Sequence, residues 1–159
     1  SKKYREKYPH KVYKTQKKYR ENNRERLNEY RKQYVAKRKT NDINFKLRLS
    51  LSKRILRAIK EHYSEKAAKT VDLLGCSVTE VRNYLESKFK SGMSWENHGK
   101  IWHIDHIKPC DSFDLTKPEE QYKCFHYTNL QPLWITTKIA KEHGDFETIG
   151  NIEKANKII

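Results

Sequence analysis

The sequence predicts an α+β protein in which a basic helical arm and scaffold helices precede a small strand–loop–strand–helix module. Three observations support this class. The first forty residues are strongly basic and contain no glycine, apolar residues recur every four positions between 41 and 63, and two short β-prone runs precede a final helix signal. We divide the chain into a basic arm (1–41), a helical scaffold (42–91) and the module (92–159).

The arm carries most of the positive charge. The formal net charge is +15, and residues 1–40 hold 16 Lys and Arg against 4 Glu, a net of +12. A nearly neutral domain with a cationic arm suits a polyanionic partner. Nucleic acid fits better than a membrane surface, because the arm has few aliphatic residues to insert between lipids.

The arm is expected to form one helix from Pro9 to Lys39, roughly 45 Å long at about 1.5 Å per residue. Tyr8, Tyr19 and Tyr30 are 11 residues apart, close to three helical turns, so they would share one face. A solvated, partly disordered tail is the alternative. The candidate DNA contacts in the arm are Lys17, Tyr19, Arg20, Arg24, Tyr30, Arg31 and Arg38.

The scaffold is expected to contain two helices that build a core. Leu47, Leu51, Ile55 and Ile59 form an apolar stripe over a helix at 41–63. A second helix follows Ser77, which begins a capping box with Glu80. This helix is expected to carry Phe89 and to end at Ser91-Gly92.

The three cysteines, Cys76, Cys110 and Cys124, form no Cys-x-x-Cys pair and do not indicate a disulfide framework. Cys110 and Cys124 either pack together or lie apart, and a metal-binding pair is one interpretation. The chain shows no secretion signal and no long apolar run, so a membrane location is not expected.

The strongest chemical signal is the adjacent pair Asp105-His106 in the first β-prone run, Trp102–Ile107. A neutral histidine is a good general base near pH 7, and an oxygen-bound Mg²⁺ can neutralise a phosphate and its leaving oxygen. Neighbouring strand residues face opposite sides, so a bulge or strand-end twist must bring both to one site. His103 is either a neighbour of the metal or phosphate, or structural.

These residues stand among runs that resemble the HNH endonucleases, the ββα-metal nucleases found in phage, giant-virus and mobile-intron open reading frames. The resemblance covers roughly residues 73–144. The matching runs, in chain order, are Gly92-Met93-Ser94-Trp95-Glu96-Asn97, Trp102 through Cys110, Phe113-Asp114-Leu115 and Cys124 through Trp134.

The resemblance assigns roles to individual residues. His106 matches the general base, Asp105 the metal ligand, and Asn129 the residue that holds the loop and orients the histidine. Lys141 matches a basic residue that meets phosphate. Lys138 stands where the family has an Asn or His as second metal ligand, and a charged lysine cannot ligate Mg²⁺. Its ammonium could pair with Asp105 instead, or a neighbour could replace the missing ligand; the lysine is either natural or an engineered substitution.

The resemblance therefore implies a metal-dependent endonuclease acting on double-stranded DNA, of the homing or free-standing kind. Its cofactor would be one Mg²⁺, with Mn²⁺ as a substitute, and it would act as a monomer or homodimer in a bacterial or virus-infected host cell. The alternative is a catalytically silent DNA-binding protein that keeps the fold, inactivated at Lys138. A single-stranded RNA-binding protein that stacks bases on its tyrosines is a third interpretation.

Overall fold

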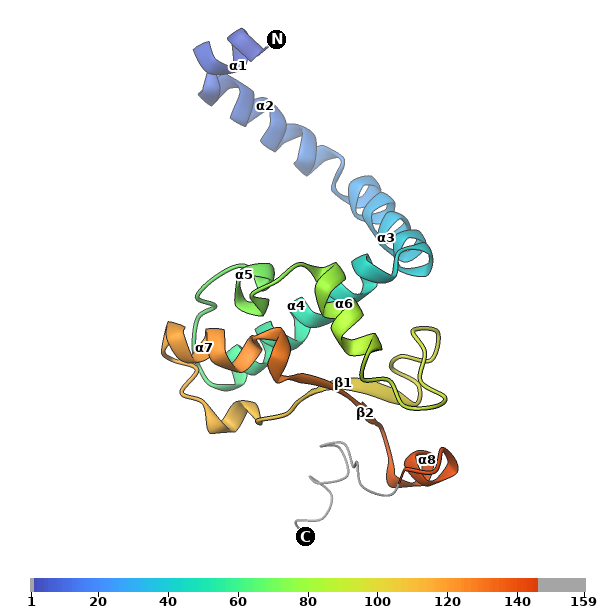
Figure 1. Cartoon of the computed structure of the whole chain (residues 1–159). Helices are drawn as coiled ribbons and strands as arrows, with labels where there is room; N and C mark the ends of the chain where they lie inside the picture. The colour runs from blue at the N-terminus through green and yellow to red at the C-terminus, as the bar shows by residue number, and fades with distance from the viewer. Residues whose placement is uncertain (1, 146–159) are drawn as a thin grey trace. The chain divides into compact units, whose positions relative to one another are not determined.

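The computed structural model describes residues 2–145 and confirms the α+β class (Figure 1). Within that range, helices accompany one antiparallel sheet of two strands. The chain divides into two compact units between Asp42 and Ile43, and each is described by itself. None of the described helices has the length and apolar character needed to cross a membrane.

The first unit consists of α1 (Lys2–Lys7), α2 (Pro9–Asn22) and α3 (Arg24–Asn41). Pro9 occupies the start of α2 as expected, but the prediction of one helix to Lys39 is wrong. Asn23 interrupts the helix at φ −115°, and its side-chain amide donates a hydrogen bond to the carbonyl of Tyr19. Asparagine competes in this way with the helical backbone. Because the break lies between Tyr19 and Tyr30, their spacing does not place them on one helical face.

The second unit combines the small sheet with several helices. Its elements, in chain order, are α4 (Ile43–Glu61), α5 (Thr70–Leu74), α6 (Val78–Glu86), β1 (Trp102–His106), η1 (Cys110–Ser112), α7 (Pro118–Phe125), η2 (Tyr127–Asn129), β2 (Leu130–Trp134) and α8 (Thr137–Glu142). The loop expected between the strands thus contains the helix α7 and two 3₁₀ turns. Pro118 begins α7 and is followed by Glu119 and Glu120 in the first turn. This is a helix-start signal that the sequence analysis did not use.

The apolar stripe of α4 is buried along its whole length, as expected, and it serves two clusters. Leu47 and Leu51 pack in a cluster with residues of α6 and both strands, including Trp102 and Trp134. Ile55 and Ile59 pack in a second cluster with α5 and α7. One helix therefore fixes the sheet and the inter-strand helix relative to each other.

The capping box at the start of α6 is confirmed: Ser77 Oγ accepts from the Glu80 amide, and Glu80 accepts from the Ser77 amide. The predicted end at Ser91-Gly92 is wrong, because α6 ends at Glu86. Phe89 lies in the following turn, where its ring packs against Trp102 and Trp95 at centroid distances of 4.8 and 5.4 Å. These aromatic contacts hold Phe89 in the core without a helix.

The strands pair in an unbroken register from Trp102 opposite Trp134 to His106 opposite Leu130. No bulge therefore redirects Asp105 or His106. After β2, the Thr136 hydroxyl accepts a hydrogen bond from the Ile139 amide and caps α8.

Buried Gln121 anchors α7 between the strands. Its side chain accepts from the Ala67 amide at 2.9 Å and donates to the carbonyls of Glu65 and Leu115, each at 2.8 Å. Because all three partners lie outside α7, this amide ties the helix to the α4–α5 loop and to the chain that precedes it.

Candidate functional site

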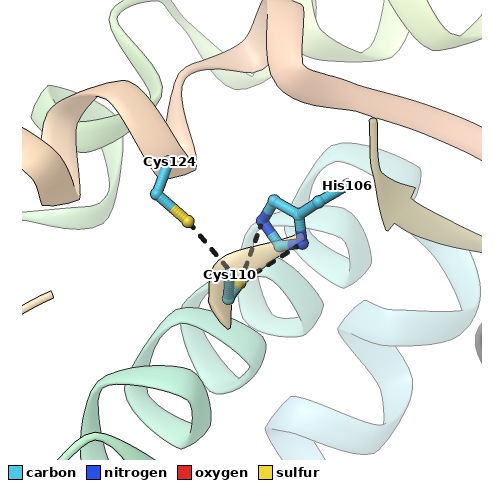
Figure 2. Close-up of side chains that lie close together, drawn as sticks. All are labelled: His106, Cys110 and Cys124. Atoms are coloured by element: carbon cyan, nitrogen blue, oxygen red, sulfur yellow. Dashed lines mark hydrogen bonds between the residues drawn. The ribbon is translucent and has the colours of Figure 1, made fainter. Parts of the chain in front are cut away.

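The imidazole of His106 lies beside two cysteines (Figure 2). Its Nδ1 is 3.6 Å from Cys110 Sγ, and Cys110 Sγ is 3.5 Å from Cys124 Sγ. His106 ends β1, Cys110 begins η1, and Cys124 lies near the end of α7. Cys124 is fully buried, whereas His106 and Cys110 are partly exposed. The two cysteines thus pack together, which the sequence analysis left open.

The contacts within this group shift the pKa values of the two thiols in opposite directions. A hydrogen bond from the Cys124 thiol, together with the neighbouring His106 imidazole, lowers the pKa of Cys110 to about 5. The same hydrogen bond and burial raise the pKa of Cys124. The contacts thus make Cys110 the more acidic of the two thiols.

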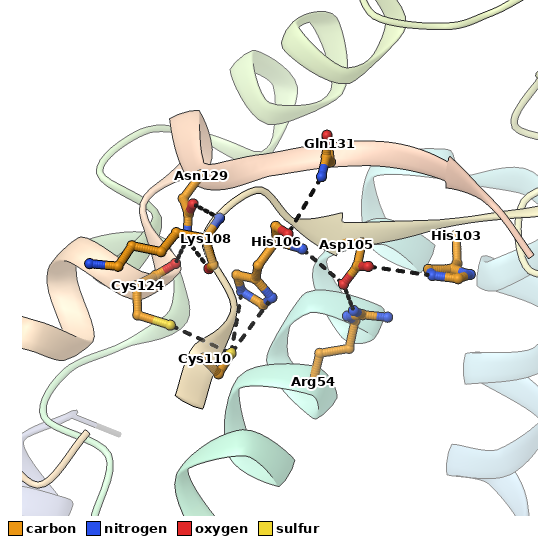
Figure 3. Close-up of polar contacts among 9 residues, drawn as sticks. All are labelled: Arg54, His103, Asp105, His106, Lys108, Cys110, Cys124, Asn129 and Gln131. Atoms are coloured by element: carbon orange, nitrogen blue, oxygen red, sulfur yellow. Dashed lines mark hydrogen bonds and ion pairs between the residues drawn. The ribbon is translucent and has the colours of Figure 1, made fainter. Parts of the chain in front are cut away.

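The carboxylate of Asp105 is buried, with 4% of the residue exposed, and it faces α4 (Figure 3). Its Oδ1 lies 3.8 Å from an Arg54 guanidinium nitrogen, and its Oδ2 lies 4.0 Å from His103 Nε2. Burial lowers the pKa of Arg54, although Asp105 opposes that change. Burial also lowers the pKa of His103, so its ring is neutral near pH 7.

Asp105 and His106 are therefore neighbours in sequence whose side chains meet different partners (Figure 3). Asp105 faces Arg54 and His103, whereas His106 faces Cys110 and, edge to face, the ring of Phe125 at 6.0 Å. This divergence follows from the alternation of side chains along a regular strand. The backbone still links the two, because the His106 amide donates to Asp105 Oδ1 at 2.9 Å.

Asn129 clamps the loop that follows β1 (Figure 3). Its side-chain oxygen accepts from the Lys108 amide at 2.9 Å. Its side-chain nitrogen donates to the carbonyls of Lys108 and Cys124, at 3.1 and 2.8 Å. The amide thereby joins the backbones on either side of the cysteine pair. These three bonds go to backbone atoms of Lys108 and Cys124 and hold the loop, while orientation of the histidine by Asn129 stays a prediction.

Helix α8 presents Lys138 and Lys141 as exposed side chains. Within residues 2–145, no ion pair of Lys138 is found, and the cation beside Asp105 is Arg54. Arg54 thus forms the ion pair with Asp105 that the sequence analysis considered for Lys138.

The arm residues chosen as DNA contacts are exposed on α2 and α3. Tyr19 and Tyr30 are 51% and 69% exposed, and Tyr19 Oη accepts from Arg26 at 2.9 Å. Arg38 donates a hydrogen bond to Tyr34 Oη and forms an ion pair with Asp42, in which Nε lies 3.2 Å from Oδ2. Lys17, Arg20, Arg24 and Arg31 present their charges to solvent.

Sequence reasoning missed Arg54 as a partner of Asp105. The sequence places Arg54 at the border of the buried stripe of α4, three positions after Leu51 and directly before Ile55, but this position does not identify its partner. Its partner lies on a strand far along the chain, so the pairing depends on how α4 packs against the sheet.

Two uncharacterized proteins of Acanthamoeba polyphaga mimivirus are similar to this chain. One is 33% identical over 137 residues, which cover 86% of this chain and 58% of the relative. The other is 41% identical over 92 residues, which cover 58% of this chain and 40% of the relative. The chain thus spans about half the length of the curated relatives it matches. No family model and no solved structure matches it.

Proposed function

We propose that this chain is a metal-dependent DNA endonuclease of the HNH type whose activity is reduced by Lys138. The Asn-clamped loop that follows Asp105 and His106 and the capped helix after the second strand support this proposal. The divergence of the Asp105 and His106 side chains favours the second candidate below. The motif runs around these residues resemble those of the HNH endonucleases.

The observation that carries the proposal is the clamp formed by Asn129. It ties the loop after His106 to the backbone of Cys124, so the backbone two residues after the candidate base is held by hydrogen bonds. A base held at the end of a strand and partly exposed can accept a proton from a water that attacks a phosphodiester. His106 is the residue we assign to that step.

Asp105 is the one carboxylate that the proposal assigns to a Mg²⁺ shared with the substrate. Helix α8 contributes an exposed lysine at the expected second ligand position. Mg²⁺ commonly binds through one or two carboxylates together with waters and substrate phosphates. Such an ion, when bound, would stabilise charge on the phosphate. Arg54 would have to move away from Asp105 or share its carboxylate with the ion.

A second candidate is a DNA-binding protein that keeps the fold without hydrolysis. The ion pair of Arg54 with Asp105 favours it, because a guanidinium already neutralises the only carboxylate assigned to the metal. The exposed lysine at position 138 favours it as well. Both candidates use the same basic arm, with 16 Lys and Arg in residues 1–40, to contact DNA phosphates.

The biological setting belongs to the same proposal. The similar proteins come from a giant virus, which supports action inside a host cell on viral or host DNA. The proposal includes a role as a homing or free-standing mobile-element nuclease that acts as a monomer or homodimer.

Cleavage of a supercoiled plasmid tests the proposal. The chain and its Lys138→Asn variant are treated with a chelator, dialysed and incubated with plasmid and Mg²⁺. Cleavage that disappears with EDTA and with His106→Ala in the same background supports the endonuclease. Absence of cleavage by both chains, with retention of plasmid in a gel-shift assay, would select the DNA-binding candidate instead.

A further inference from the structure

We propose that His106, Cys110 and Cys124 form a binding site for one Zn²⁺ ion, distinct from the Mg²⁺ position at Asp105. The three side chains come from three elements, β1, η1 and α7, and their candidate ligand atoms all lie within 4.8 Å of one another (Figure 2). This site does not depend on the proposed hydrolysis.

Two of the three ligand distances are close to those of a tetrahedral zinc site, and the third pair, Cys124 and His106, lies within 4.8 Å. With Zn–S near 2.3 Å and Zn–N near 2.0–2.1 Å, tetrahedral angles place two sulfurs about 3.8 Å apart, and a sulfur and a nitrogen about 3.6 Å apart. The structure has 3.5 Å between the two sulfurs and 3.6 Å between Cys110 Sγ and His106 Nδ1. Binding of the ion would require the imidazole to rotate toward Cys124, and the terminal torsion of histidine permits such a rotation.

The ligand set selects a soft divalent ion over Mg²⁺. Thiolate and imidazole ligands suit Zn²⁺, whereas Mg²⁺ requires oxygen ligands. Two thiolates and a neutral imidazole cancel the charge of the ion, which suits a site that contains the fully buried Cys124. Three protein ligands leave the fourth position for water or another small ligand.

The surroundings hold the ligands in place before a metal arrives. Asn129 bonds the backbone of Cys124 directly and the backbone of Lys108, two residues before Cys110. Cys124 packs with Phe125 and Ile55 in the second hydrophobic cluster. Fixed ligand backbones reduce the ordering cost of binding and favour a site of defined geometry.

Zinc at this site has a consequence for the proposed function. An imidazole that ligates Zn²⁺ cannot accept a proton from water at the same nitrogen. Occupancy by zinc and base catalysis by His106 therefore exclude each other. This consequence, unlike the site, rests on the proposed function.

Cobalt substitution tests the site without any activity measurement. The full-length chain is reduced, freed of metal and titrated with Co²⁺, and Zn²⁺ is then used to displace it. We expect one equivalent to bind, with sulfur-to-cobalt charge-transfer absorption and the visible bands of tetrahedral Co²⁺. Cys110→Ser, at a partly exposed position, should weaken binding by about 100-fold or more.

Cys76→Ser is the matched control, because Cys76 is also partly buried but lies outside the cluster. It should leave the cobalt spectrum unchanged, and circular dichroism checks that each variant is folded. Two results would overturn the proposal: no thiolate bands in the reduced chain, or bands that persist in Cys110→Ser. The chain could form a Cys110–Cys124 disulfide in air. If it still binds no metal after reduction, the proposal is overturned.

Discussion

At the residue scale, the pairing of Arg54 with Asp105 controls the charge of the candidate metal position. Asp105 is buried, whereas the side chain of Arg54 is 38% exposed. His103, the other neighbour, is held neutral by burial. Removal of the guanidinium would therefore take a cation away from a buried carboxylate, which is costly in a folded protein.

Arg54→Met tests this pairing through stability. We expect the free energy of unfolding to fall by about 1–3 kcal/mol, a value reduced for the partial exposure of the arginine. Urea denaturation followed by circular dichroism measures it. Arg57→Met is the control on the same helix, since Arg57 forms an exposed pair with Glu61 and should change little. Equal losses in both variants would show that the Asp105 pairing adds nothing.

The partly buried His98 should lower the free energy of unfolding in acid. Burial, with smaller contributions from Lys46, Arg54 and His103, lowers its pKa to about 4. In the unfolded chain, the pKa is about 6.5. Above that pH, neither state binds the proton, whereas between about 6.5 and 4 only the unfolded chain does, so stability falls as the pH drops.

The His98→Gln variant should weaken that dependence. Between pH 7 and 4.5, the wild-type chain should lose about 1–3 kcal/mol more of its unfolding free energy than the variant. Denaturation at a series of pH values gives the two curves. Their difference must be flat above about pH 7, and parallel curves across the acid range would refute the assignment to His98.

At the element scale, a single amide at the junction of η2 and β2 holds the loop after β1. Asn129→Ala removes three hydrogen bonds to that loop and to Cys124. We expect an unfolding free energy lower by about 1–3 kcal/mol and faster hydrogen exchange at the Lys108 amide. Asn83→Ala, at an exposed position of α6, is the control. Unchanged exchange at Lys108 would contradict the clamp.

Features of the fold that are encoded locally could be predicted from the sequence. The stripe of α4, the capping box at Ser77 and the cap at Thr136 depend on a few adjacent residues. The end of α6 could not be placed, because Phe89 is held by Trp95 and Trp102 rather than by a helix. The break at Asn23 had only two weak signals, the consecutive asparagines.

The candidate site, too, could be predicted from the sequence only in part. The adjacency of Asp105 and His106 is visible in the sequence, and so are the cysteines on either side of Phe113-Asp114-Leu115. The approach of Cys110 to Cys124 requires the path of the chain through η1 and α7. The approach of Arg54 to Asp105 requires α4 to pack on the sheet, and no local pattern specifies it.

At the scale of the whole molecule, the uneven charge predicts salt-sensitive binding to DNA. Each phosphate contact contributes about 0.9 to the slope of log affinity against log salt. Replacing Lys17, Arg20, Arg24 and Arg31 with Gln should therefore lower the slope by up to about 4. Fluorescence anisotropy with duplex DNA at several salt concentrations measures it.

A matched set of four exposed lysines in the second unit provides the control: Lys60, Lys88, Lys100 and Lys117, each changed to Gln. The slope should fall much less for this set than for the arm set. Equal falls would remove the special role of the arm. Tighter binding of single-stranded RNA than of duplex DNA would instead favour the stacking interpretation of the arm tyrosines.

The central claim is that this chain is an HNH-type endonuclease held back at Lys138, and the rate of Mg²⁺-dependent plasmid cleavage tests it most directly. The rate is compared among the wild-type chain, Lys138→Asn and Lys138→Gln, all freed of zinc beforehand. The account predicts that Asn raises the rate by about tenfold or more, with Gln, which lacks the charge but is longer, in between. Equal rates in the three chains, or cleavage in none of them, would contradict it.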